Sequence, residues 1–450
     1  MMTSKERILC AVNGIAGDHM PLTTWCFGFK PPEQLRWKTG GIEVKYWYTH
    51  RLEHIHTLPQ TWTLEDDFKR VLAWLSLGID DVLDVSVPWD ISPEVTYSDT
   101  VISKGEAGGD RTYPVMIRKY QTPAGPVSHA VKKTGDEPEG WPVQPSKVEL
   151  FEDYNVPRGV RHLVSEPGDI KKAKYLYMPP DINQKQWFEQ RMAEVKRFGD
   201  KYGIFVQAWT AFGIDAVIWM SGVENAVMMA MADPESFGRL VDNIFETDFF
   251  RTELSLMTPG IDMVCQRGWY SSTDFWSPEL FDAFVLPHLR ELTALAHRHG
   301  RKFGYVMTTG VETFGSRLAD AGVDVLYFID PVMDSLSLIK ARELFGDRMT
   351  LVGGTNSISL ETGDRERIFR EVKEAIEASI PKLREMLATQ QLNLVNVNIS
   401  QNSTPDQGRS QSQAFSKTPE NREQGIEAAT DTKIEQDRVI VSKGLLSLYA

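Results

Sequence analysis

Cysteine is scarce in this chain of 450 residues. Only Cys10, Cys26 and Cys265 occur, and they are spread along the sequence. Three isolated cysteines provide neither a disulfide framework nor a CxxC metal-binding motif, so we expect a protein of the reducing cytoplasm. Cys265 is expected to pack as a small hydrophobic side chain, as most isolated buried cysteines do.

Positive charge is also in short supply. The chain has 49 Lys and Arg against 62 Asp and Glu, which gives a formal net charge of -13 at pH 7. Nucleic acids and anionic membranes would repel such a surface, because no basic stripe compensates for it. We therefore expect neither of them as a partner.

Long apolar runs are missing as well. The N-terminal MMTSKERILCAVNG (1–14) lacks the continuous apolar core of a signal peptide, and no later stretch approaches a membrane span. We therefore expect neither export nor membrane insertion. The chain does contain 42% hydrophobic and 10% aromatic residues, the composition of a globular protein with ample core. Its length predicts one large catalytic domain with appendages.

Residues 181 to about 385 alternate regularly between strand and helix patterns. Asp233 and Pro234 are typical of a helix start, and 277–300 reads as one helix that is capped by Ser277 and ended by Gly300. Strands that alternate with such helices imply parallel βαβ units, and their number predicts a (β/α)₈ TIM barrel. The predicted strands are 18–25, 204–212, 260–269, 302–310, 323–330 and 349–357, and one more strand follows a Gly-capped helix end within 77–90.

Two regions depart from this pattern. One lies within the predicted barrel domain (1–387), and the other follows it. Residues 95–180 are rich in Gly, Pro and short alternating pieces, which predict an inserted lobe of β-hairpins with TPAG as one turn. Residues 388–450 are rich in Gln, Asn, Ser and Thr, so we expect a disordered tail. Within that tail, 392–400 alternates well enough for a degenerate eighth strand.

Six segments occur in a characteristic order: DHMP, DPESFGRLVDNI, GIDMV, WSPELFDAFVLPHLRELTALAHRHG, LADAGVDVL and LVGGTNSISLETGDRERIFREVKEAI. Together they resemble the uroporphyrinogen decarboxylase superfamily, whose members include heme-pathway decarboxylases and the methyltransferases of corrinoid and coenzyme M pathways. The resemblance implies a TIM barrel with its site at the C-terminal ends of the strands. This agrees with the strand and helix pattern.

The chain departs from both familiar branches of that superfamily. Where the decarboxylases carry an arginine-rich segment, it reads TTWCFGFKPPEQLRW and retains only Lys30 and Arg36. A substrate with eight carboxylates needs several guanidinium forks, so this substrate is disfavoured. Where the methyltransferases often carry His-x-Cys-Gly, the chain has Met307, Thr308, Thr309 and Gly310, and it has no Cys beyond 265. The thiol-activating zinc site is therefore not expected.

The reaction that remains within the resemblance is transfer of a methyl group from a small donor, such as an aryl ether or amine, to a corrinoid protein. The cobalamin-type corrinoid would be a cofactor carried by that partner, and the enzyme itself could form a homodimer. Two alternatives stay open. One is a lyase acting on a smaller acid, for which Arg267 and Lys30 are the only candidates for a basic clamp. The other is a non-catalytic barrel.

Functional side chains of a barrel appear at its strand ends. We predict Asp330 and Asp84 as catalytic carboxylates, although Asp330 could equally cap the next turn or helix, and Asp84 could be bonded to backbone. For Arg267, an ion pair with a neighbouring Asp is the commoner alternative. The residues expected to bind substrate are Trp25, Trp209, Gln266, Arg267, Tyr270, Met307, Thr309 and Asn356.

Tryptophan is more abundant near these positions than a core requires. Aromatic walls would suit an aryl methyl ether or the face of a corrin, although Trp also packs ordinary lobes. His50, His54 and His56 share one segment without a second cluster to complete a metal shell, so we predict no metal site. The tryptophans in question are Trp25, Trp47, Trp62, Trp89, Trp209, Trp269 and Trp276.

Overall fold

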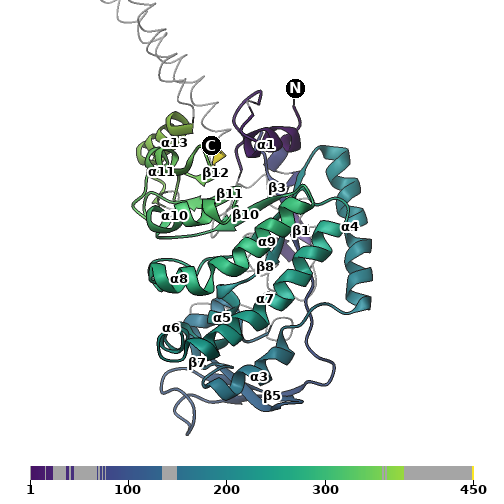
Figure 1. The fold of residues 1–450 in the computed structure, drawn as a ribbon, viewed down its shortest axis with the longest axis vertical. Coiled ribbons are helices and arrows are strands. Elements are labelled where there is room, and N and C mark those ends of the chain that lie inside the picture. Colours follow the sequence, from purple (N-terminus) through teal and green to yellow (C-terminus); the bar gives the residue numbers. More distant parts are fainter. Residues whose placement is uncertain are drawn as a thin grey trace, which may run out of the picture.

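Figure 1 shows the computed structural model of the chain. It describes residues 2–15, 17–23, 37–39, 42–44, 68, 71–72, 74–76, 78–133, 149–356, 359, 362–379 and 448–449. Several predictions lie outside these residues: Trp25, the histidines at 50–56, the strand at 392–400 and the character of the tail.

A seven-stranded sheet forms the centre of the molecule. Six of its strands are parallel and follow one another in sequence order, and β13 is antiparallel to β12 at one edge. These strands confirm the predicted parallel βαβ units, but closure into a barrel is not seen within the described residues. The strands are β3 (Val82–Ser86), β8 (Phe205–Ala211), β9 (Met263–Gln266), β10 (Lys302–Val306), β11 (Val325–Ile329), β12 (Thr350–Gly353) and β13 (Leu448–Tyr449).

The predicted first strand, 18–25, is wrong over its described part. Residues 17–23 form no strand, and Leu22 is only an isolated bridge residue. The backbone N–H of Leu22 donates to the side chain of Asp80 at 3.1 Å, and the N–H of Asp80 donates to the carbonyl oxygen of Leu22, so one residue provides both contacts. A short hairpin of β1 (Trp37–Thr39) and β2 (Ile42–Val44) forms a separate sheet.

Local sequence signals explain most helix boundaries. Asp233 accepts a hydrogen bond from the N–H of Ser236 at 3.1 Å, with Pro234 in the first turn, as predicted. The segment 277–300 is two helices rather than one, because Pro287 has no N–H to continue the ladder and the chain breaks at Val285. The helices are α1 (Ser4–Val12), α3 (Ile170–Ala173), α4 (Ile182–Tyr202), α5 (Ile214–Ser221), α6 (Val223–Ala232), α7 (Pro234–Met257), α8 (Pro278–Phe284), α9 (Leu286–Arg298), α10 (Val311–Asp320), α11 (Leu338–Phe345) and α13 (Arg365–Ser379).

No single helix in the described ranges has the length and apolar composition of a membrane span. Taken together, α5 and α6 meet that criterion, but the pair is bent by 108°.

Alternate residues of each strand pack into two different cores. One set of side chains packs around Ile8 and Val12 of α1 and includes Phe205, Trp209 and Cys265. We call this side the inner face of the sheet. The other set packs against the covering helices. The period of two along a strand therefore decides which residues face α1 and which face the helical layer.

The inserted lobe is an antiparallel sheet, as predicted. Its strands are β4 (Thr96–Ile102), β5 (Val115–Thr122), β6 (Gly125–Lys132) and β7 (Gly159–Arg161), in that order, and TPAG forms the turn between β5 and β6. The lobe and α3 lie at one end of the molecule, and α1 lies at the other end (Figure 1). Phe151, between β6 and β7, contacts Trp89, which follows β3, so the lobe meets the chain just after β3.

Candidate functional site

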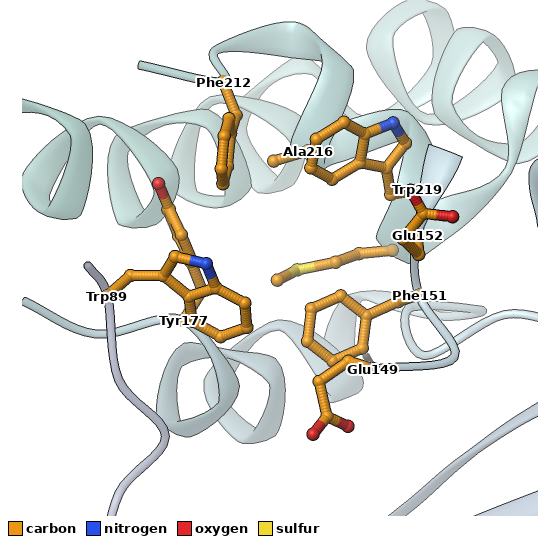
Figure 2. A pocket seen from close by; sticks show the side chains of 9 residues that line it. Trp89, Glu149, Phe151, Glu152, Tyr177, Phe212, Ala216 and Trp219 are labelled. Atoms are coloured by element: carbon orange, nitrogen blue, oxygen red, sulfur yellow. The ribbon is translucent and has the colours of Figure 1, made fainter. Parts of the chain in front are cut away.

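A small cavity lies where the lobe meets the carboxyl ends of β3 and β8 (Figure 2). Its empty space is about 280 Å³, which includes the open mouth, and most of it is too narrow for more than a water-sized group. The side chains that line it are Trp89, Glu149, Phe151, Glu152, Tyr177, Phe212, Ala216, Trp219 and Met220.

Five aromatic rings dominate this lining, and we call them the aromatic box: Trp89, Phe151, Tyr177, Phe212 and Trp219. Each is no more than 5% exposed. Successive ring centroids are 5.0 Å (Phe212–Trp219), 5.6 Å (Tyr177–Phe212), 5.2 Å (Trp89–Tyr177) and 6.3 Å (Trp89–Phe151) apart, at tilted angles. These are favourable aromatic distances, so the rings hold one another in place.

Arg251 of α7 anchors the box to the strands. Its Nη1 donates to the Tyr177 hydroxyl at 2.8 Å, and that hydroxyl donates to Asp248 Oδ1 at 2.5 Å. The other oxygen of Asp248 accepts from the N–H groups of Phe212 and Gly213. Burial raises the pKa of Asp248 and that of Tyr177. A fully buried polar network therefore orients two rings of the box.

A second buried cluster lies behind Trp219. The guanidinium of Arg267 contacts Asp153 and lies 3.4 Å from Asp215 Oδ2, with its centre 5.1 Å from the Trp219 ring centroid. Asp215 also accepts the N–H of Tyr270 at 3.0 Å. Burial raises the pKa of Asp215 to about 7, while Arg267 acts in the opposite direction. Arg267 is thus ion-paired with neighbouring Asp residues, which is the alternative to a substrate-binding role inferred for it from the sequence.

A third cluster lies on the lobe side. Arg118 binds Asp99 through two hydrogen bonds of 2.8 and 2.9 Å and donates to Glu149 at 3.2 Å. The Tyr120 hydroxyl also donates to Glu149. Figure 2 shows the carboxylates of Glu149 and Glu152 at the edge of the box, turned away from the rings. Each of these two clusters pairs one guanidinium with two carboxylates, so the border of the box is acidic.

Asp330 and Asn356 come together at the ends of β11 and β12. Asp330 Oδ1 accepts the N–H groups of Val332 and Met333 at 2.8 and 2.9 Å, and Asn356 Nδ2 donates to its other oxygen at 2.6 Å. These contacts are those of a residue that holds the turn after β11. A catalytic role for Asp330 stays a prediction.

The segment 307–310 is divided between two environments. Met307 is fully buried in the core between sheet and helices, because the alternation of β10 turns it away from the inner face. Thr309 donates to Asp274. Asp334 accepts the N–H of Gly310 at 2.6 Å, and burial, with smaller contributions from neighbouring acids, raises the pKa of Asp334. Met307, predicted to bind substrate, therefore packs in this core and does not line the cavity.

Asp84 takes part in a polar group on the inner face. Gln207 Nε2 and Trp209 Nε1 donate to its Oδ1 at 2.6 and 2.9 Å, and the Tyr327 hydroxyl donates to Gln207 at 2.6 Å. Asp84 is thus bonded to the side chains of Gln207 and Trp209. Gln207 was missed, although a lone polar residue within the apolar run IFVQAWTAF was a signal for it.

The remaining predicted residues do not line the cavity. Gln266 is buried beside Gly213, so close that a Cβ on that glycine would lie 2.4 Å from its Nε2. Cys265 is fully buried, and burial raises the pKa of its thiol well above the usual range. Among the described residues, no three His, Cys, Asp or Glu side chains come together as metal ligands. Cys265 therefore does not fit a thiolate zinc site.

The architecture defines an α/β protein with a parallel sheet whose candidate site lies at strand ends beneath an inserted β lobe. Residues 178–385 match the model of the uroporphyrinogen decarboxylase (URO-D) family, which confirms the resemblance inferred from the sequence. No curated protein matches the chain. Among solved structures, a methyltransferase from Methanosarcina mazei shares 16% identity at a TM-score of 0.47, over 84% of this chain and 91% of that one.

Proposed function

We propose that the protein is a methyltransferase that moves a methyl group from a small donor, held in the aromatic box, to a corrinoid carried by a partner protein. The observation that carries the proposal is the box itself. It is a narrow space with a mostly apolar lining at the strand ends of a uroporphyrinogen decarboxylase-like domain. Such a space suits a small molecule with exposed methyl groups.

The charges around the box disfavour the alternative of a lyase acting on an acid. A carboxylate substrate needs cationic partners. Arg118, Arg251 and Arg267 each already contact carboxylates of the chain. An acid in the cavity would meet further negative charge from Glu149 and Glu152, so a neutral or cationic donor fits better.

In the proposed step the methyl group leaves a nitrogen or oxygen atom, which keeps the electron pair of the broken bond. The reduced cobalt of the partner's corrinoid, a co-substrate here, supplies the pair for the new bond. The role of this chain is to hold the donor, exclude water and orient one methyl group toward the mouth of the box. The network of Arg251, Tyr177 and Asp248 keeps the rings in position for this task.

The test uses the purified full-length protein with Co(I) cobalamin and a panel of aryl methyl ethers and methylated amines. Methyl transfer is followed by the absorbance of methylcobalamin. We expect transfer from at least one donor, reduced on the order of tenfold or more by Trp219→Leu and unchanged by Trp187→Leu, a tryptophan on α4 that does not line the cavity. Silence with every donor would reject the proposal.

A further inference from the structure

A ligand in the cavity would mainly contact aromatic rings. Of its nine lining side chains, five are aromatic, two are the apolar Ala216 and Met220, and two are the carboxylates Glu149 and Glu152. None of the nine is positively charged. Ring faces carry negative electrostatic potential and attract cations, and this attraction grows when water is excluded. The lining thus discriminates between ligands by charge as well as by shape.

The charged groups around the box add to this preference. Behind the rings, the described side chains include three guanidiniums, and each contacts at least one carboxylate. The carboxylates outnumber them by two to one: Arg118, Arg251 and Arg267 against Asp99, Glu149, Glu152, Asp153, Asp215 and Asp248. Asp99 is exposed, and Glu149 and Asp153 are half-buried, so a cation in the box would be attracted by negative charge at its border.

Three of the rings already have a cation near one face. The guanidinium of Arg251 lies 4.1 Å from the Phe212 centroid and 6.0 Å from the Tyr177 centroid, and that of Arg267 lies 5.1 Å from the Trp219 centroid. Neither arginine lines the cavity, so both sit behind their rings. Trp89, Phe151 and Tyr177 complete the lining, and Asp248, Asp153 and Asp215 offset the two arginines.

We infer that the aromatic box binds a methylated ammonium ion. The claim that this ion is the methyl donor rests on the proposed methyl transfer, but the claim that the box binds it does not. A quaternary ammonium head has no hydrogen-bond donor and presents only methyl groups, which matches walls of ring faces. When it loses a methyl group, the nitrogen keeps the bonding pair and leaves as a neutral amine, so no proton donor is required. The space is narrow, so binding of the head group requires the cavity to widen, and Met220 is the unbranched, flexible side chain of its lining.

Calorimetric titration of the full-length protein compares choline with 3,3-dimethylbutan-1-ol, its neutral isostere, and tetramethylammonium serves as a third probe. We expect both cations to bind and the isostere to bind on the order of tenfold more weakly, or not at all. Trp219→Phe is expected to weaken choline binding, Trp219→Leu to abolish it, and Trp187→Leu to leave it unchanged. Equal binding of choline and its isostere would overturn the inference, as would binding of neither.

Glu152→Gln gives a second test that keeps the box and its shape. It removes one negative charge at the edge, and we expect choline binding to weaken severalfold while any isostere binding is unaffected. This variant decides the matter if Trp219→Leu does not fold, and unchanged choline binding in it would reject the electrostatic argument. Cation binding without methyl transfer to Co(I) cobalamin would reject only the proposed function. Transfer from an ether without cation binding would reject only the inference.

Discussion

Arg251 of α7 donates two hydrogen bonds to one acceptor, the carbonyl oxygen of Val87, at 3.1 Å from Nε and 2.8 Å from Nη2. Val87 follows β3, and the same Nη2 reaches the carbonyl of Trp209 in β8 at 3.2 Å. One side chain therefore ties the ends of two neighbouring strands to a helix. The aromatic box is built directly on this connection.

We expect Arg251→Met to lower the free energy of unfolding by roughly 3–5 kcal/mol, because it leaves Asp248 buried without its cation. Urea unfolding at pH 7 measures the change. Arg239→Met is the matched control, since Arg239 forms an exposed helix pair with Glu235, and such pairs contribute about 0.3–0.5 kcal/mol. Similar losses in the two variants would contradict the anchoring role.

The stability of the protein should depend on the ionisation of Asp215. Burial raises its pKa from 3.8 to about 7, so between these values the folded chain holds a proton that the unfolded chain has released. Stability from this group is therefore present at pH 4 and lost as pH rises toward 7, by up to about 1.4 kcal/mol per pH unit. Urea unfolding of wild type and Asp215→Asn at pH 4.5, 6 and 7.5 should show the stability of the wild type falling relative to that of the variant as pH rises. Parallel profiles would show that Asp215 does not titrate in this window.

Gly213 begins α5 beneath the box with φ 53° and ψ −131°, a conformation that side chains rarely adopt. A Cβ there would also lie 2.4 Å from Gln266 Nε2. We expect Gly213→Ala to destabilise the protein by about 2 kcal/mol or more. Gly300→Ala is the control, because Gly300 has φ 66° but open space around it, so only the backbone strain of roughly 1 kcal/mol applies. Thermal unfolding compares them, and equal shifts would show that the contact with Gln266 is unimportant.

Asp330→Asn tests the two readings of that carboxylate. Its hydrogen bonds to the turn predict a loss of roughly 1–2 kcal/mol in the free energy of unfolding. Asp364→Asn is the control, since Asp364 accepts two N–H groups in the same way but at the start of α13 rather than at a strand end. If methyl transfer at a temperature where both variants are folded falls only in Asp330→Asn, and by a hundredfold or more, the catalytic role follows. Equal activity of the two variants would show that Asp330 only holds the turn after β11.

Much of the architecture could be predicted because its signals are local. The apolar runs at 204–212 and 323–330, the cap at Asp233 and the TPAG turn each depend on residues within a few positions of one another. The break at Pro287 was also local, but the helix pattern on both sides of it concealed it. The strand predicted at 18–25 is wrong over its described part, where Leu22 contacts the backbone and side chain of Asp80, a residue far along the chain, instead of extending a ladder.

By itself, the sequence determined the class of the sheet, the inserted lobe and the resemblance of residues 178–385, because periodicity, capping and motif order are written in neighbouring residues. Only the tertiary structure decided where the site lies. The box gathers side chains from residue 89 to residue 219, and no periodicity relates them. Packing likewise turned Met307 toward the helices and paired Arg267 with Asp153 and Asp215. Burial and long-range contact set the environment of these groups, and neither can be read from a residue's neighbours in the chain.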